Sequence, residues 1–387
     1  MKDFTYSYPV NVYFGTDAAK KAISQEIGKY GKNVMLAYGG GSVKKSGIYD
    51  AVVSMLKEAG KDVTDFPGIM PNPTYAKVQE GAALAKEKNV DFILAVGGGS
   101  VIDCCKIISA QAKTDKDIWE MEFTDHVFPT EFVPMGAVVT ATGTGAEMNN
   151  GAVITHEEKK IKTGVFGAFA NFAVLDYEYM KSLPAKQVIS GAFDTLSHCM
   201  ETYFGSPRTA NISDEINEAV MRNVIRNLKI VSKNVFDEDA RRELMWDSAM
   251  AENGIQKFGR VPSFGANRTD PQLGPYTDTT PGGGGAGTHP LLYRHIYKDA
   301  AERFAHFAET VWDISAEGKT ADETALAGIQ ALADFIREIG LPINFKELGI
   351  QADDAMLRAV ADSTNIMAGC CKKLNADEIF EILKECR

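Results

Sequence analysis

The sequence predicts an α/β fold, in which an N-terminal doubly wound dinucleotide-binding domain is followed by an all-helical C-terminal domain. Three observations support this prediction. Apolar runs ending in glycines alternate with amphipathic segments over about residues 8–180, helical spacing of apolar residues dominates after Pro184, and a length of 387 residues suits two domains. We place the domains at residues 1–184 and 185–387.

Three continuous apolar runs predict strands that are buried on both faces of a parallel sheet. They cover residues 34–38, 92–96 and 135–139. Residues 47–59 and 74–87 lie between the first two runs and have helical spacing, so strands and helices alternate as in a doubly wound layer. The segment Tyr6–Val12 predicts an edge strand, and pairing of this edge across a two-fold axis would make the protein a homodimer.

The C-terminal half predicts helices with a period of 3.6 residues. They cover residues 188–203, 213–231, 237–253, 300–314, 322–339 and 353–366. Asp322 and Asp353 are the expected N-caps of the last two. Residues 259–290 contain several prolines and four consecutive glycines, so we expect no helix longer than a turn or two there.

Composition and charge narrow the class of function. Asp and Glu number 52 against 41 Lys and Arg, and the resulting charge of −11 argues against a nucleic acid or an anionic membrane as partner. A small-molecule enzyme is the expectation. Six cysteines are too few for a disulfide framework, and the adjacent pairs Cys104–Cys105 and Cys370–Cys371 are poorly spaced for bridging each other. With no apolar signal-type segment, we expect a cytoplasmic, reduced protein.

A glycine turn follows the apolar run 92–96 and precedes a helix-like segment. Glycines let backbone N–H groups approach a phosphate, and the positive end of the following helix adds to the attraction. Open α/β sheets bind ligands at the carboxyl ends of their strands. We therefore expect cofactor contacts here, whereas the alternative is a merely flexible turn. The candidate residues are Gly97, Gly98, Gly99, Ser100 and Asp103.

A second glycine turn follows the run 34–38, and its candidate cofactor residues are Gly39, Gly40, Ser42 and Lys45. An acidic residue in this position would bind the ribose 2′-hydroxyl and repel a 2′-phosphate. None is present, and two lysines follow, so we favour NADP over NAD. The alternative is that both lysines are solvated charges on a helix face.

A third turn follows the run 135–139 and carries Thr140, Thr142 and Thr144 among glycines. Small hydroxyl residues at a strand end predict a pocket for the nicotinamide or the pyrophosphate. A structural turn in which a threonine side chain bonds the backbone is the alternative.

Asp194 and His198 lie four residues apart in a predicted helix, which places both side chains on one face. A carboxylate and an imidazole so placed could hold a divalent cation. The alternative is an Asp–His ion pair or a histidine satisfied in the core. Two ligands do not complete a catalytic metal site, which needs three and an open position.

Motifs along nearly the whole chain resemble the iron-containing, or group III, alcohol dehydrogenases, and most closely their NADP-dependent butanol dehydrogenase-like branch. They are residues 11–15, the turn 39–45, Pro71-Asn72-Pro73, residues 97–103 with Lys106, residues 140–147, Ser182-Leu183-Pro184, and residues 194–198 with Glu201. The resemblance implies a cleft between the domains that holds nicotinamide and a metal, Fe²⁺ or Zn²⁺, at Asp194 and His198. It also adds Asn72, Lys160 and Leu183 to the candidate cofactor residues.

Members of the resembled family supply further histidines, two to the metal and one between them to proton relay, at positions that match Asn267, Pro281 and Pro271 here. Proline has no side-chain donor and asparagine is a poor substitute for imidazole. His289 and His295 lie nearby with a different spacing. Either the metal site has been lost, or residues 261–290 differ from those of the natural chain.

The expected function is reversible, metal-assisted hydride transfer between NADP(H) and short to medium unbranched alcohols or aldehydes, with Asp194 and His198 as the catalytic residues. A second hypothesis is a catalytically impaired NADP-binding protein on the same scaffold. A third is another enzyme of this architecture, such as a glycerol dehydrogenase or a dehydroquinate synthase-like lyase.

Overall fold

The computed structural model describes the chain except residues 1–2, 4, 160, 207–210, 264–285 and 365–368. The chain divides into two compact units. The sheet unit comprises Ser7–Leu183, and the helical unit comprises Pro184–Arg387 with the first six residues. None of the helices in the described part of the chain has the length and apolarity that a membrane crossing needs.

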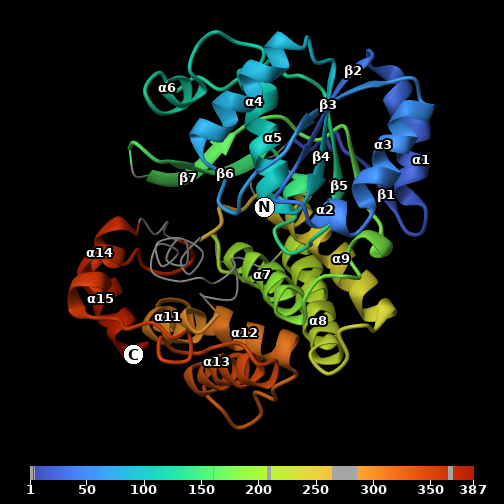
Figure 1. Ribbon diagram of the computed structural model, residues 1–387. Coiled ribbons are helices and arrows are strands. Elements are labelled where there is room, and N and C mark those ends of the chain that lie inside the picture. The colour runs from blue at the N-terminus through green and yellow to red at the C-terminus, as the bar shows by residue number, and fades with distance from the viewer. Residues whose placement is uncertain (1–2, 4, 160, 207–210, 264–285, 365–368) are drawn as a thin grey trace. The chain divides into compact units, whose positions relative to one another are not determined.

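The sheet unit is built on six parallel strands in the order β1-β8-β5-β4-β2-β3 (Figure 1). The strands are β1 (Asn11–Phe14), β2 (Asn33–Tyr38), β3 (Asp62–Phe66), β4 (Phe92–Gly97), β5 (Met135–Val139) and β8 (Phe172–Leu175). An antiparallel hairpin of β6 (Gly151–His156) and β7 (Ile161–Phe166) stands apart from this sheet. The apolar runs 34–38, 92–96 and 135–139 are therefore confirmed as strands.

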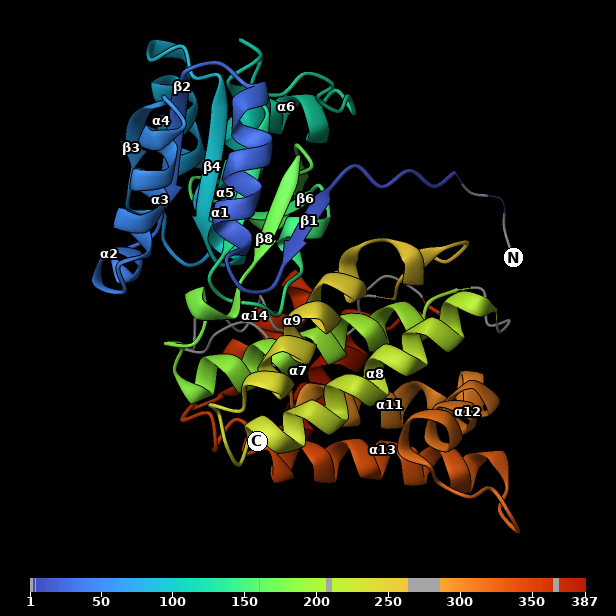
Figure 2. The ribbon, with the colours of Figure 1, turned by 90° about the vertical axis from the view of Figure 1, so that its right-hand side faces the viewer.

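Helices cover both faces of this sheet (Figure 2). Their bounds are α1 (Ala18–Glu26), α2 (Ser42–Lys45), α3 (Ile48–Glu58), α4 (Tyr75–Glu87), α5 (Gly99–Gln111) and α6 (Ile118–Phe123), with short 3₁₀ turns η1 (Ile27–Lys29), η2 (Ala146–Met148) and η3 (Tyr177–Tyr179). Apolar residues of α1 and α3 form one core with β2, β4 and β8. Helices α4 and α5 pack against each other, and α5 also packs on β4. The predicted doubly wound α/β class is confirmed.

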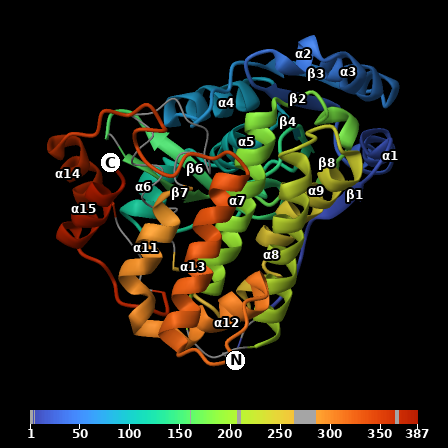
Figure 3. The same cartoon turned by 90° about the horizontal axis from the view of Figure 1, so that it is seen from below.

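The helical unit contains the remaining helices (Figure 3). They are α7 (Ala185–Tyr203), α8 (Ile212–Val231), α9 (Glu238–Glu252), η4 (Ile255–Lys257), α11 (Thr288–Ile296), η6 (Tyr297–Ala300), α12 (Ala301–Trp312), α13 (Ala321–Glu338), α14 (Asp354–Ser363) and α15 (Ala376–Glu385). Helices α7, α8 and α9 pack against one another, and α12 packs on α13. The prediction of an all-helical second domain is confirmed.

Two local predictions need correction, the N-cap of α13 and the start of the edge strand. Asp353 does cap α14, but the N-cap of α13 is Thr320, whose hydroxyl accepts from the Glu323 amide, and Asp322 lies in the first turn. The prediction for residues 259–290 falls mostly outside the described residues, and only its last three residues lie in α11, with Pro290 in the first turn, where an amide hydrogen has no partner within the helix. The edge strand begins at Asn11 rather than Tyr6.

A buried carboxyl group anchors the end of β7. Both oxygens of Glu122 on α6 accept from the amide of Phe166, at 3.1 and 2.9 Å, and the side chain is 6% exposed. Burial raises the pKa of Glu122 to about 7, against the smaller lowering effect of the Phe166 amide. Ionisation of Glu122 therefore destabilises the folded protein.

The substitution Glu122→Gln should stabilise the protein more at pH 8 than at pH 5. Between its ordinary value of 4.5 and about 7, native Glu122 holds a proton that the unfolded chain has lost, so wild-type stability falls as pH rises and is level above pH 7. The gain over wild type should grow by about 2–3 kcal/mol across this window, as measured by urea unfolding. Glu120→Gln, on the exposed face of α6, is the control, and an equal pH response of the two variants would contradict the assignment.

Candidate functional site

The three turns predicted to bind a cofactor lie along one edge of the sheet. Tyr38 of β2 is paired with Val96 of β4, and Gly97 at the end of β4 is paired with Val139 of β5. Strands β3 and β4 flank β2 on opposite sides. From β2 the chain passes to β3 on one side, and it then continues with β4 and β5 on the other, so the strand order reverses between β2 and β4. Ligands of open α/β sheets bind outside the carboxyl ends of the strands at such a point.

The turn after β4 is tightly packed and ends in a helix N-terminus. Gly98 is the N-cap of α5, which begins at Gly99. A Cβ on Gly99 would lie 2.5 Å from the Thr144 hydroxyl, so only glycine lets these two turns approach each other so closely. The first amides of α5 and its positive end therefore face the same edge as the β2 and β5 turns, which suits a pyrophosphate.

Asp103 is used by the fold in a way that the sequence pattern does not reveal. Its carboxylate accepts from the Val153 amide of β6 at 2.9 Å. Lys106, which is 0% exposed, donates to the Gly151 carbonyl oxygen at 2.6 Å and to the Asn149 side chain at 2.9 Å. Asp103 and Lys106 thus tie α5 to the start of the hairpin, and a contact of Asp103 with cofactor stays a prediction.

The turn after β2 treats its two lysines differently. Gly41 has φ of 112°, a conformation that favours glycine, and α2 starts at Ser42. The Lys44 ammonium lies 4.5 Å from the centre of the Tyr49 ring and 5.1 Å from that of Tyr38. Lys44 is therefore engaged by aromatic rings, although its side chain is exposed like those of Ser42 and Lys45.

The remaining candidate cofactor residues are placed as follows. The Thr140 amide donates to the Gly97 carbonyl oxygen at 3.0 Å, and the Thr144 hydroxyl accepts from the Ala146 amide at 3.3 Å, which is the structural turn considered as the alternative. Asn72 has φ of 55° and accepts from the Lys162 ammonium at 2.8 Å. Ser100, Thr142 and Leu183 are half-buried, Gly40 is exposed, and Lys160 lies outside the described residues.

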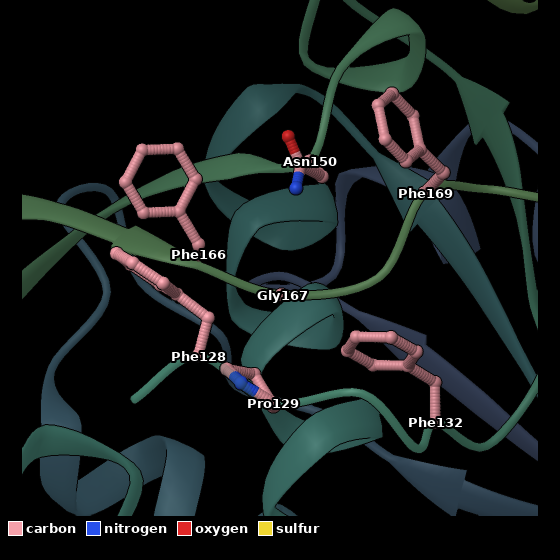
Figure 4. A pocket seen from close by; sticks show the side chains of 7 residues that line it. All are labelled: Phe128, Pro129, Phe132, Asn150, Phe166, Gly167 and Phe169. Atoms are coloured by element: carbon pink, nitrogen blue, oxygen red, sulfur yellow. The ribbon is translucent and has the colours of Figure 1, made fainter. Parts of the chain in front are cut away.

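An aromatic cavity in the sheet unit was missed by sequence reasoning (Figure 4). Its volume is about 500 Å³, and it is lined by Phe128, Pro129, Phe132, Asn150, Phe166, Gly167 and Phe169. The ring centres of Phe128 and Phe166 lie 5.4 Å apart in an edge-to-face contact on one side of Gly167. Phe132 and Phe169 lie on the opposite side. Apolar walls with a single amide are typical of a small-molecule pocket. The lining comes from three separate segments, so no local pattern could have predicted it.

Asp194 and His198 face each other on α7 in the helical unit. The Nε2 atom of His198 lies 3.8 Å from Asp194 Oδ1, and its Nδ1 atom lies 3.2 Å from Oε1 of Glu252 at the end of α9. Lys257 in the following turn approaches the other Glu252 oxygen at 2.8 Å. The imidazole therefore lies between two carboxylates, one of which is itself paired with a lysine. Glu252 was missed because nothing in the sequence joins positions 54 residues apart.

Burial and charge act against each other in this group. Burial lowers the pKa of His198, but Asp194 and Glu252 outweigh it and raise that pKa to about 9. Burial raises the pKa of Asp194 against the effect of His198. For Glu252, burial is outweighed by Lys257 and His198, which together lower its pKa.

The donors do not complete a divalent metal site. Within the described ranges, no group of three or more His, Cys, Asp and Glu side chains could hold a metal ion. Nearby His289 is bonded through both ring nitrogens, to the Ser197 hydroxyl at 2.8 Å and to the Tyr293 hydroxyl at 3.2 Å. Positions 267, 271 and 281 lie outside the described residues, and the proline at 281 offers no side-chain donor atom.

Comparison with known proteins assigns both halves of the chain to the same family. A family described as "Iron-containing alcohol dehydrogenase" matches residues 9–177, and one described as "Fe-containing alcohol dehydrogenase family, C-terminal" matches residues 188–386. The chain is 36% identical to probable NADH-dependent butanol dehydrogenase 1 of Bacillus subtilis, over 99% of both chains. It is 34% identical to the NADPH-dependent aldehyde reductase YqhD of Escherichia coli, over 90% of both.

A solved structure shares the fold. The crystal structure of NADH-dependent butanol dehydrogenase A from Thermotoga maritima superposes with a TM-score of 0.92 at 30% identity, covering 100% of this chain and 99% of that one. The relatives' names include both NADH and NADPH as cofactors.

The substitution Glu252→Gln should lower the pKa of His198 by roughly one unit from its value of about 9, because one of the two neighbouring carboxylate charges is lost. The titration of the His198 ring resonances by NMR measures this shift. Glu238→Gln, on the exposed first turn of the same helix, should leave the pKa unchanged. An unchanged pKa in Glu252→Gln would show that Glu252 does not face the imidazole.

Proposed function

Since the chain belongs to the iron-containing alcohol dehydrogenase family, we propose that it is an NADP(H)-dependent alcohol dehydrogenase or aldehyde reductase. Its substrates would be short to medium unbranched alcohols and aldehydes, as in a butanol dehydrogenase. The observation that carries the proposal is the meeting of three glycine- and threonine-rich turns at the carboxyl ends of β2, β4 and β5.

The bound nicotinamide would supply or accept the hydride, and the protein would bind and orient the reactants. The α5 N-terminus would hold the pyrophosphate, because Gly98 and Gly99 expose backbone amides there. Four phenylalanines around the cavity suit a hydrocarbon chain, and the Asn150 amide offers one polar contact. In the helical unit, Asp194 and His198 would be the catalytic residues.

The preference for NADP rests on the turn after β2. Lys44 is held over two tyrosine rings, so Lys45 is the lysine available to a 2′-phosphate. Names among the relatives point both ways, since butanol dehydrogenases with NADH and an aldehyde reductase with NADPH have similar identity to the chain.

The incomplete donor set favours a second candidate, a catalytically impaired NADP-binding protein. Asp194 and His198 are two donors, and Asn267 and Pro281 stand where the resemblance places the others. Under this second function NADPH would still bind at the sheet edge, but no aldehyde would be reduced.

We also propose a homodimer that forms through β1, because this strand is one edge of the sheet and an unpaired edge generally has to be covered. We propose a cytoplasmic location, because none of the six cysteines is in a disulfide.

The leading function predicts that pure protein reduces butanal with NADPH. His198→Ala should abolish turnover and leave the Kd for NADPH unchanged, because His198 and the three turns belong to different units. Initial rates from NADPH absorbance and NADPH titrations measure both effects. Binding of NADPH without turnover on any aldehyde would select the second candidate, and failure to bind NADP(H) would reject both.

Lys45→Ala should raise the Kd for NADPH roughly three- to tenfold, because it removes one solvent-exposed charge near the phosphate. The Kd for NADH should stay the same, which isothermal titration of both cofactors would measure. Lys44→Ala is the matched control, and it should change the NADPH affinity less. Equal losses for the two cofactors would argue against a 2′-phosphate contact.

A further inference from the structure

The two cysteines at positions 370 and 371 turn their sulfur atoms toward each other. The two Sγ atoms lie 3.4 Å apart, which is contact distance for two thiols. Neither is in a disulfide, and Cys370 is only 4% exposed whereas Cys371 is half-buried. The pair lies in the helical unit, outside the residues considered so far for catalysis or cofactor binding.

Hydrogen bonds to two other elements fix the backbone on both sides of this pair. The Cys370 amide donates to the Phe204 carbonyl oxygen at the end of α7, at 2.8 Å. The Lys372 amide donates to the Asp299 carboxylate in η6, at 3.1 Å. The two sulfur atoms are therefore held together by the fold, so a ligand that binds both loses little further conformational freedom.

The four cysteines outside the pair are less accessible than Cys371. Cys104, Cys105, Cys199 and Cys386 are buried. Burial raises the pKa of all four thiols, to about 12 for Cys104 and Cys386. Because the thiolate is the reactive form, they are inert at neutral pH. The other adjacent pair, Cys104–Cys105, thus provides an internal comparison.

The geometry selects the kind of atom that can bridge the pair. A direct disulfide is disfavoured, because adjacent Cα atoms are about 3.8 Å apart and disulfides prefer more than about 4.4 Å. Zinc needs four ligands, and no group of three or more His, Cys, Asp and Glu side chains among the described residues could hold a metal ion. Mercury(II) prefers sulfurs on opposite sides of the metal. Arsenic(III) binds two sulfurs at close to a right angle, which suits sulfurs already in contact.

We propose that Cys370 and Cys371 form a dithiol site for monosubstituted trivalent arsenicals. Each thiol displaces one hydroxyl from the arsenic centre, so that R–As(OH)₂ and two thiols give a cyclic dithioarsenite and two waters. Two As–S bonds form and two As–O bonds break, and each leaving hydroxyl takes the thiol proton. Arsenic stays in the trivalent state, so no oxidant or reductant is needed.

The test uses the full-length reduced protein and one equivalent of phenylarsine oxide. Intact-mass spectrometry should show one adduct per chain, and peptide mapping should place it on residues 370–371. The adduct should survive excess glutathione and be removed by 2,3-dimercaptopropanol, because only a dithiol can replace both As–S bonds together. Absence of an adduct, or its location at residues 104–105, would overturn the proposal.

Single substitutions test the two-sulfur attachment. Cys371→Ser and Cys370→Ser leave one thiol each, so the adduct should be lost to glutathione roughly 10²-fold faster than in wild type, because the effective concentration of the second thiol is gone. Cys104→Ser should behave as wild type. Circular dichroism checks that each variant is folded, and peptide mapping of the wild type does not depend on the variants. An equally resistant adduct in both single variants would also overturn the proposal.

Discussion

The sheet edge that gathers the three turns depends on the position of β4. All of its residues are buried, and it pairs with β2 on one side and β5 on the other, so the turn that follows it lies between the turns of its two neighbours. Close packing then requires glycine where these turns meet, as the approach of Gly99 to Thr144 shows. A residue with a side chain at Gly99 would push the β5 turn away and open the edge where a dinucleotide would lie.

In the helical unit, charge compensation has the corresponding role. A histidine between two carboxylates would leave an excess of negative charge in a poorly solvated place, and Lys257 compensates for it. The turn at Gly254, with φ of 87°, directs the chain so that Lys257 returns to the end of α9. Both ring nitrogens of His198 thus face a carboxylate, Asp194 at Nε2 and Glu252 at Nδ1.

The sequence was informative where a pattern is local. The strands at 34–38 and 92–96 were predictable because residues buried on both faces of a parallel sheet form continuous apolar runs. Thr320 and Asp322 are both good N-caps two positions apart, so the sequence could not choose between them. The contact of His198 with Glu252 and the phenylalanine cavity join distant segments, and they follow from packing that no spacing rule contains.

The buried ammonium of Lys106 connects α5 to a segment that lines the aromatic cavity. The helix that starts at Gly99 also grips the segment containing Asn149 and Gly151, and Asn150 between them lines the aromatic cavity. The N-terminus of α5, where a pyrophosphate would lie, and the Asn150 side of the cavity are thus connected through the hydrogen bonds of Lys106. A displacement of α5 along its axis would therefore move Asn150, and with it one side of the cavity.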